Sequence, residues 1–420
     1  MQGRDKKQRR ALSHIGGPVA VSGGSADLAR ALEASLGVTS DVETREHVHG
    51  FHSYPARLHP VTARRLVEQL SRVGDVVLDP FCGSGTVLVE GRLAKRRVVG
   101  VDANPLAIEL AWLKTLSTTE AERADIVFGA RKIGQAAEER RRRKAGATRR
   151  YGPDDVALFD PHVLLELDGL RAGIEATSDP FVRRTLWLAL SSILVKVSRR
   201  PGDTARMQAP RRLAGGFALR LFFDKVEELA RRLAEFRARL PHGAPPATVM
   251  LGDARRLAGV SDGSVHLAVT SPPYPGNYDY LEHHAVRLRW LGLDATAFDT
   301  AELGARRHLE RLPDRAARER WATELSETLS AIARVLTEGG RAVLILADSV
   351  VRQRALYADE LVRQIAPRAR LRVAAIASQE RPHFHAPSAR AFDRAPRREH
   401  AIVVERASDA AKRRPAGGTC

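Results

Sequence analysis

Short apolar runs alternate along the chain with stretches in which apolar residues recur every three to four positions, and this alternation predicts an α/β protein. The short runs predict strands at residues 75–78, 97–101, 248–251, 265–269, 341–347, 371–378 and 400–405. The helical spacing predicts helices at 26–36, 60–67, from 87, from 106, and at 161–177, 180–195, 217–240, 282–291, 321–336 and 351–365. Gly339-Gly340 is expected to end the helix before it.

The helical pattern continues from residue 106 to residue 247, between the second and third predicted strands. This long interruption predicts a helical insertion in a sheet domain. The predicted units are a basic N-terminal tail with a short helix (1–46), a first part of the sheet domain (47–105), the insertion (106–247), a second part of the sheet domain (248–406) and a disordered tail (407–420).

A glycine-containing loop joins the first predicted strand to the helix that follows it. The loop lacks the Lys-Ser/Thr of a phosphate loop and the G-x-G-x-x-G spacing of a dinucleotide fold. Its glycines let the backbone approach a ligand, and the helix N-terminus offers free N–H groups. The loop reads Asp79-Pro80-Phe81-Cys82-Gly83-Ser84-Gly85-Thr86, and Asp102 ends the second strand, where an acid suits two ribose hydroxyls.

A second loop, Ser271-Pro272-Pro273-Tyr274, follows the apolar run 265–269. Two prolines remove two backbone donors and stiffen the chain, so the loop offers mainly hydrogen-bond acceptors. Open α/β sheets keep ligand sites at the carboxyl ends of their strands. The loop therefore suits a planar amine that is gripped through its N–H groups and stacked on an aromatic ring.

Together the two loops resemble the motifs of the amino-group DNA methyltransferases, which methylate cytosine N4 or adenine N6. Ser-Pro-Pro-Tyr is similar to the catalytic motif, and the loop 79–86 is similar to the motif that holds S-adenosylmethionine. The resemblance implies a Rossmann-like methyltransferase sheet, mostly parallel with an antiparallel last strand. It also implies that the cofactor contacts Asp79, Pro80, Phe81, Gly83, Ser84, Gly85, Thr86 and Asp102, and that Asp253, after the third strand, accepts from the adenine amine.

A histidine-rich stretch precedes the first strand of the sheet domain. His52-Ser53-Tyr54-Pro55-Ala56 and the residues after it resemble the family pattern H-x-Y-P-A-K-F-x-P, with Arg57 and Leu58 in place of Lys and Phe. The resemblance implies that Tyr54 and Pro55 help to wall the methionine end of the cofactor. The histidines at 49, 52 and 59 have no helical i, i+4 spacing and no Cys or carboxylate cluster beside them, so we expect no metal.

The charge balance favours a polyanionic partner, because the chain carries 68 Lys and Arg against 50 Asp and Glu, a net charge of +18. An Arg-rich composition is also typical of GC-rich genomes. Within the insertion, one basic stretch is the best candidate for phosphate contacts, although it would also suit an exposed loop without a ligand. Its basic residues are Lys196, Arg199, Arg200, Arg206, Arg211 and Arg212.

Composition also limits the class of protein. Two cysteines exclude a disulfide framework and a Cys-based zinc site, and Cys82 is interpreted as a packing residue. No apolar run is long enough for a membrane span, and the polar, basic N-terminus does not resemble a secretory signal. We therefore expect a cytoplasmic protein with no membrane partner. The charged segment 294–320 is expected to lie over the active site.

The resemblance implies methyl transfer from S-adenosylmethionine to the exocyclic amine of a flipped-out DNA base. The amine would donate its two N–H hydrogen bonds to Ser271 and to the Pro272 carbonyl, and the base would stack on Tyr274. Ser at the first motif position favours cytosine N4. Adenine N6, an RNA base, or an inactive nucleic-acid-binding protein remain alternatives, and a restriction endonuclease is a candidate partner. Cytosine C5 methylation needs a Pro-Cys nucleophile, which the chain lacks.

Overall fold

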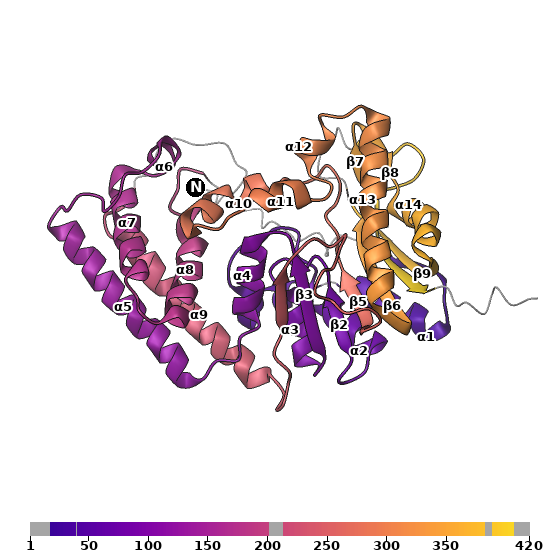
Figure 1. Ribbon diagram of the computed structural model, residues 1–420, viewed down its shortest axis with the longest axis horizontal. Helices are drawn as coiled ribbons and strands as arrows, with labels where there is room; N and C mark the ends of the chain where they lie inside the picture. Colours follow the sequence, from indigo (N-terminus) through magenta and orange to yellow (C-terminus); the bar gives the residue numbers. More distant parts are fainter. Residues whose placement is uncertain (1–16, 39, 201–212, 383–388, 407–420) are drawn as a thin grey trace, which may run out of the picture.

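The computed structural model describes residues 17–38, 40–200, 213–382 and 389–406, and its centre is one eight-stranded sheet (Figure 1). The strands lie in the order β1-β9-β10-β6-β5-β2-β3-β4. Their bounds are β1 (Val19–Gly23), β2 (Val76–Asp79), β3 (Arg97–Asp102), β4 (Thr248–Leu251), β5 (Val265–Thr270), β6 (Leu336–Ala347), β9 (Leu371–Glu380) and β10 (Arg398–Arg406). Each of the seven predicted strands is present.

The strand directions confirm the predicted fold class. Neighbouring strands from β4 to β6 pair in parallel, whereas β10 is antiparallel to both β6 and β9. The order reverses between β2 and β5, and this switch point is where open α/β sheets bind ligands. One strand of this sheet was not predicted. It is β1, which pairs antiparallel with β9 and lies in the segment that the sequence assigned to a basic tail and a helix.

Helices cover both faces of the sheet and build a separate lobe at its β4 side (Figure 1). Proline at the first turn starts α2, α4, α7 and α8, and Thr119 with Glu122 forms a capping box at the start of α5. The helices are α1 (Ala26–Leu36), α2 (Pro60–Leu70), α3 (Thr86–Leu93), α4 (Pro105–Lys114), α5 (Glu120–Arg142), α6 (Pro153–Leu158), α7 (Pro161–Glu175), α8 (Pro180–Leu194), α9 (Phe217–Arg239), α10 (Tyr280–Leu291), α11 (Thr296–Ala301), α12 (Arg306–Leu309), α13 (Asp314–Val335) and α14 (Ala358–Ile365), with short 3-10 turns η2 (Val42–Arg45), η3 (His47–Gly50) and η4 (Ala366–Ala369).

Alternation along the strands divides the sheet's apolar side chains between two cores. Val77 and Leu267 face α1, α2 and α3, whereas their neighbours Leu78 and Ala268 face α13 and α14. Because both faces are covered, the central strands are apolar almost throughout, as expected of a mostly parallel sheet.

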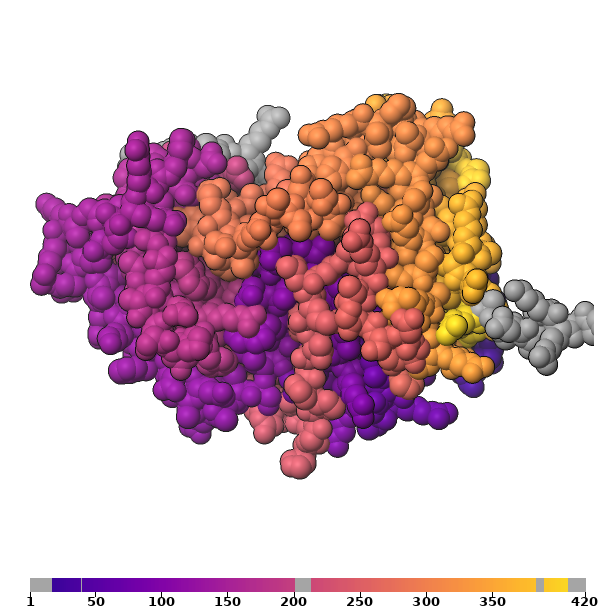
Figure 2. Space-filling model, in the orientation of Figure 1, coloured from indigo at the N-terminus to yellow at the C-terminus, as the bar shows by residue number. Residues whose placement is uncertain are grey.

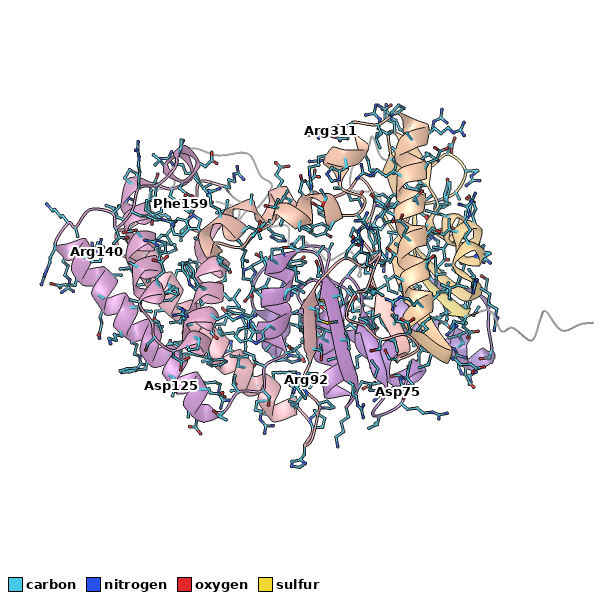
Figure 3. All side chains as sticks on the ribbon, in the orientation of Figure 1. Asp75, Arg92, Asp125, Arg140, Phe159 and Arg311 are labelled. Atoms are coloured by element: carbon cyan, nitrogen blue, oxygen red, sulfur yellow. The ribbon has the colours of Figure 1, made fainter. Side chains whose placement is uncertain are left out.

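The helices of the insertion, α5 to α9, form a third core that continues onto α4 and α10. Arg92 of α3 lies in the seam between the sheet domain and this lobe (Figure 3), where its Nε donates to the Pro245 carbonyl at 2.8 Å and its guanidinium covers the ring of Phe236. Figure 2 shows α10 and α11 crossing from the insertion to the sheet domain on one face of the molecule. The predicted boundary at residue 106 falls inside α4, which packs on β3 and β4.

Two local predictions near the end of the chain are wrong. Residues 351–365 do not form one helix, because β7 (Ser349–Val351) and β8 (Arg354–Leu356) make a hairpin before α14. Its two-residue turn places Arg352 and Gln353 at φ of 50° and 71°, a conformation for which Gly or Asn is the usual sequence signal. Gly339-Gly340 does not end a helix either, because α13 ends at Val335 and β6 begins at once.

Candidate active site

A cavity lies at the carboxyl ends of β2, β3 and β5, where the switch point of the sheet predicts a ligand site. Ten of the predicted site residues line it, and they come from four separate stretches of the chain. They are Tyr54, Asp79, Pro80, Phe81, Gly83, Ser84, Thr86, Asp102, Ser271 and Pro273. The fold therefore brings most of the predicted cofactor residues and part of the catalytic loop to one cavity.

The two glycines of the loop 79–86 have different structural roles. Gly83 lines the cavity with a φ of +49°, and a Cβ there would lie 3.2 Å from the ring of Tyr54. Gly85 caps α3 with a φ of +88°, and a Cβ there would lie 3.1 Å from Cα of Ala111. Gly85 thus lets α4 pack against the loop, and it does not line the cavity.

Two buried carboxylates lie behind this loop. Asp102 accepts from the backbone N–H of Gly83 at 2.8 Å and of Asn104 at 2.9 Å, and burial raises its pKa to about 6 despite these bonds. Asp79 accepts from Phe81 N–H at 3.1 Å and from the Thr270 hydroxyl at 2.7 Å, and burial raises its pKa to about 7. Both acids thus hold the loop in place and keep acceptor capacity at the cavity.

The catalytic loop divides between the cavity and the protein interior. Ser271 and Pro273 line the cavity, whereas Tyr274 lies outside the lining and its hydroxyl donates to Glu399 at 3.1 Å. Glu399, at the start of β10, also accepts from Nε of the buried Arg381 at 3.0 Å. Burial and Glu399 raise the pKa of the Tyr274 phenol well above its usual value, and the Ser271 hydroxyl partly offsets that rise.

Aromatic residues that the motifs did not single out line the cavity instead. Tyr280 and Phe298 lie in its wall, and Tyr54 stacks between Tyr280, at 6.3 Å between ring centroids, and His284, at 4.9 Å. The sequence signal was the aromatic loop Tyr278–Tyr280, whose role could not be separated from that of Tyr274.

The segment expected over the active site contributes to the cavity through α11 and the residues after it. Glu302 lines the cavity, accepts from the backbone of Tyr280 and pairs with Arg307 at 2.7 Å. This segment thus places a buried carboxylate and the Phe298 ring opposite the cofactor loop.

Besides Gly85, two further predicted cofactor residues do not line the cavity. Pro55 is absent from its lining, and Asp253 is held by Arg255 in a two-pronged ion pair, at 3.0 Å from Nε and 2.7 Å from Nη2 to Oδ2. The neighbouring Ala254 lines the cavity in its place. The role expected of Asp253 would require this ion pair to open or to be shared.

The basic stretch is only partly described. Lys196 is exposed, and partial desolvation together with Lys225 lowers its pKa to about 8. Arg199 donates to Asp160 at 2.8 Å, and the half-buried Arg200 has no hydrogen-bond partner at Nε. Arg206, Arg211 and Arg212 lie outside the described residues.

Comparison with known proteins now identifies the domain. The model of the DNA methylase family, which covers N6 and N4 methyltransferases, matches residues 29–112, a range that contains Tyr54, the loop 79–86 and Asp102. Residues 29–112, a fifth of the chain, match the amino-methyltransferase family. S-adenosylmethionine is the cofactor of such methyltransferases, and the cavity fits it: Gly83 leaves room beside Tyr54, and Asp102 presents a carboxylate at the tip of β3.

Individual relatives match short stretches of the chain. The chain is 32% identical over 82 residues to the Type II methyltransferase M.MjaII of Methanocaldococcus jannaschii (20% of this chain, 16% of that protein) and 38% identical over 78 residues to M.MvaI of Kocuria varians (18% and 17%). It is 40% identical over 68 residues to a tRNA (guanine(10)-N2)-dimethyltransferase of Methanothermobacter thermautotrophicus (16% and 20%). The match thus spans a fifth or less of each relative.

Solved structures share only a general likeness with the methyltransferase. The rRNA methyltransferase aviRa of Streptomyces viridochromogenes aligns with 91% of this chain and 98% of its own, at 13% identity and a TM-score of 0.33. TrmN of Thermus thermophilus aligns with 83% of this chain and 49% of its own, at 12% identity and a TM-score of 0.32. Among the described residues, no helix combines the length and apolar character that a membrane crossing needs.

Proposed function

We propose that this methyltransferase transfers a methyl group from S-adenosylmethionine to the exocyclic amine of a flipped-out DNA base, with cytosine N4 the favoured target. The observation that carries the proposal is that Ser271 and Pro273 of the catalytic loop share one cavity with Gly83 and Asp102 of the cofactor region. A group bound by the first pair would lie beside a cofactor bound by the second.

The chemistry of an aromatic amine explains why a loop rich in acceptors is needed. Its lone pair is delocalised into the ring, so the nitrogen is a poor nucleophile. The cofactor, when bound, supplies an electrophilic methyl group. Acceptance of the two N–H hydrogens by the Ser271 hydroxyl and the Pro272 carbonyl would favour a pyramidal nitrogen, and most of the rate enhancement would come from this fixed geometry.

The surroundings of the loop support its rigidity. Two consecutive prolines restrict the backbone, and the Tyr274 hydroxyl is fixed to Glu399, which Arg381 holds in turn. Glu399 would act as a positioning residue, because it contacts the loop and not the cavity. Stacking of the base on Tyr274, as the family motif implies, would use the face of a ring whose hydroxyl is already anchored.

The cavity wall offers a second aromatic surface for the base. Tyr280 and Phe298 line the cavity, whereas Tyr274 does not. An extruded base needs stacking partners to replace those it loses in the duplex. We propose that Tyr280 or Phe298 supplies one such face, in addition to the face that Tyr274 would provide.

Two Type II methyltransferases and the DNA methylase model favour DNA as substrate, and the net charge of +18 suits either nucleic acid. An RNA base is the second candidate, because a tRNA methyltransferase is 40% identical to the chain over 68 residues. Phosphate contacts by Lys196 and Arg200, at the edge of the insertion, belong to the proposal. The proposal also includes a cognate restriction endonuclease as a partner.

The test is transfer of labelled methyl from S-adenosylmethionine to duplex DNA and to transfer RNA, followed by nucleoside analysis of the digests. We expect N4-methylcytosine in DNA, lost in Ser271→Ala and retained in Ser330→Ala, an exposed serine on α13 that bonds only within its own helix. N6-methyladenine would change the base and keep the mechanism. Label in RNA alone would support the second candidate, and absence of label from both would contradict the proposal.

A further inference from the structure

A cluster of three ionisable side chains lies behind the cofactor cavity and takes no part in the proposed reaction. His47 and His49 come from η3, and Glu90 comes from α3. The three side chains bring one potential ligand atom each to within 4.8 Å of one another. Their exposed fractions are only 3%, 2% and 3%, so the cluster is shielded from solvent.

The hydrogen bonds of this cluster are incomplete. His49 Nε2 lies 2.7 Å from Glu90 Oε1. Glu90 Oε2 and His47 Nδ1, however, are buried without a hydrogen-bond partner. Buried polar atoms are nearly always satisfied, so two unpartnered ones in a single cluster indicate that a ligand belongs there.

We propose that His47, His49 and Glu90 form a binding site for a divalent transition metal of the zinc class. Two imidazole nitrogens and one carboxylate oxygen suit Zn²⁺, whereas Mg²⁺ and Ca²⁺ prefer oxygen ligands alone. Bonds of about 2.1 Å put tetrahedral ligands about 3.4 Å apart. A modest closure of the cluster would therefore be enough, with the metal replacing the direct contact between His49 and Glu90.

Burial affects the protonation of all three side chains. It raises the pKa of Glu90 to about 7, so a metal would have to displace a proton from this carboxyl near neutral pH. Burial is the main reason why the pKa of His47 falls to about 4 and that of His49 lies well below its usual value, so both rings are neutral and can donate a lone pair. The nearby Lys114 also has a pKa well below its ordinary value because it is buried. This lowers the charge repulsion that a metal would meet on that side.

The position of the site indicates a structural role. Glu90 lies one turn after the start of α3, the helix that follows the cofactor loop. His49 lies five residues before Tyr54, which lines the cavity. On the other side, His47 stacks on Phe236 of α9 at 5.7 Å between ring centroids. A metal here would join the Tyr54 segment to α3 next to the insertion. The sequence could not show the site, because Glu90 is 41 residues from His49.

The test measures the metal itself and does not depend on methyl transfer. The full-length wild-type protein, stripped with a chelator, is titrated with Zn²⁺ by calorimetry, and its thermal unfolding is followed with and without the metal. We expect about one equivalent of tight binding and a rise in Tm. Co²⁺ should give the visible absorption of a tetrahedral site. Glu90→Gln and His49→Ala should weaken binding by at least about 100-fold, more than the loss of an outer-shell partner causes.

His242→Ala is the matched control, because His242 is exposed and distant in sequence from the cluster, and we expect it to bind Zn²⁺ as the wild type does. If the stripped wild type binds no tight equivalent of Zn²⁺ and its Tm does not change, the proposal is wrong and the cluster is a neutral hydrogen-bonded network. The wild-type titration gives this answer even if a variant fails to fold. Metal binding without methyl transfer would leave the proposal standing and contradict only the proposed reaction.

Discussion

Two buried carboxylates behind the cofactor loop are held by backbone N–H groups and a hydroxyl, whereas the buried Asp168 of the helical insertion has a cationic partner. Asp79 and Asp102 are buried beside the cavity with pKa values of about 7 and 6, and their partners are backbone N–H groups and a hydroxyl. In the insertion, the buried Asp168 accepts from Thr148 and Tyr151 and lies 3.5 Å from Arg171.

The difference distinguishes a reactive region from a scaffold. Carboxylates without a cationic partner are poorly stabilised, and they occur where a ligand can still use them. Charges that are satisfied within one lobe hold helices together and leave little for a substrate. Among the described members of the basic stretch, Arg199 is paired with Asp160, so phosphate contacts by these members depend on Lys196 and Arg200.

The largest effect should come from the catalytic loop. Ser271→Ala removes one acceptor for the amine, and loss of one preorganised hydrogen bond at a reacting group costs about 100-fold or more in kcat. Cofactor affinity should be unchanged, because the cofactor contacts lie on the other side of the cavity. Single-turnover kinetics with calorimetry of cofactor binding check this. A matching loss of cofactor affinity would show that the two halves of the cavity are not separate.

Gly85→Ala should be the next most damaging change. It forces a Cβ onto a residue at φ +88° and to within 3.1 Å of the Ala111 backbone, and such strain costs about 2 kcal/mol of unfolding free energy. Gly74→Ala is the control, because Gly74 has nearly the same φ of +87° but no atom within 4 Å of the added Cβ. Urea unfolding of both should show the larger loss at Gly85. Equal losses would mean that contact with α4 is unimportant.

The raised pKa values predict two opposite pH trends. If the ionised Asp102 binds the cofactor, affinity should fall by up to about tenfold per pH unit below about pH 6. The stability of the fold without cofactor should have the opposite trend and fall as the pH rises. An acid whose pKa rises on folding stabilises the fold below its ordinary pKa of 3.8, and this contribution is lost as the pH rises through about 6 for Asp102 and 7 for Asp79.

Calorimetry of cofactor binding and thermal unfolding from pH 5 to 8 measure the two pH trends separately. Asp102→Asn should flatten the dependence of affinity on pH, because the amide does not titrate. A steep dependence that persists in this variant would assign the titration to another group.

A smaller effect is expected at the support of the catalytic loop. Glu399→Gln replaces a charge-assisted hydrogen bond to Tyr274 with a neutral one, a loss of about 1 kcal/mol, or about fivefold in kcat. Tyr274→Phe removes the same bond from the other side, so the double variant should be no slower than the slower single variant. Fully additive losses would show that Glu399 acts independently of Tyr274.

The smallest effect should come from the insertion. Arg200→Ala should weaken binding to any DNA sequence a few-fold and lower the salt dependence of log affinity by about one. Cofactor binding should stay as it is. Arg199→Ala serves as the comparison. Because Arg199 is paired with Asp160, its loss should change the stability of the insertion more than the salt dependence of DNA binding. Unchanged salt dependence in Arg200→Ala would place the DNA path elsewhere.

The parts of this molecule that could be predicted are those whose residues lie next to one another in the sequence. The loop 79–86 carries its own turn glycines, the end of its strand and its helix start, so this βα unit and seven of the cavity-lining residues followed from it. The seven central strands were predictable because both faces of the sheet are covered, which makes each strand a nearly continuous apolar run.

What could not be predicted depends on residues that only the fold brings together. Tyr274 meets Glu399 across 125 positions, and nothing near either residue signals the contact. Phe298 reaches the cavity from a charged segment whose pattern shows no apolar face. The β7–β8 hairpin was missed because Arg352 and Gln353 adopt positive φ without the glycine or asparagine that usually marks such a turn.

The N-terminal strand β1 limits how far one edge of the sheet is open to pairing with other chains. β9 would otherwise be the last strand of the sheet, with the backbone donors and acceptors of Leu371–Glu380 open along one side, and an open edge of that length is a template for pairing with another chain. β1 occupies half of it, from Ala375 to Gln379, and α1 follows directly to cover the adjoining face. Five residues that no motif marks thus protect the sheet from aggregation, and a chain cut after Gly23 would pair with its own copies through β9.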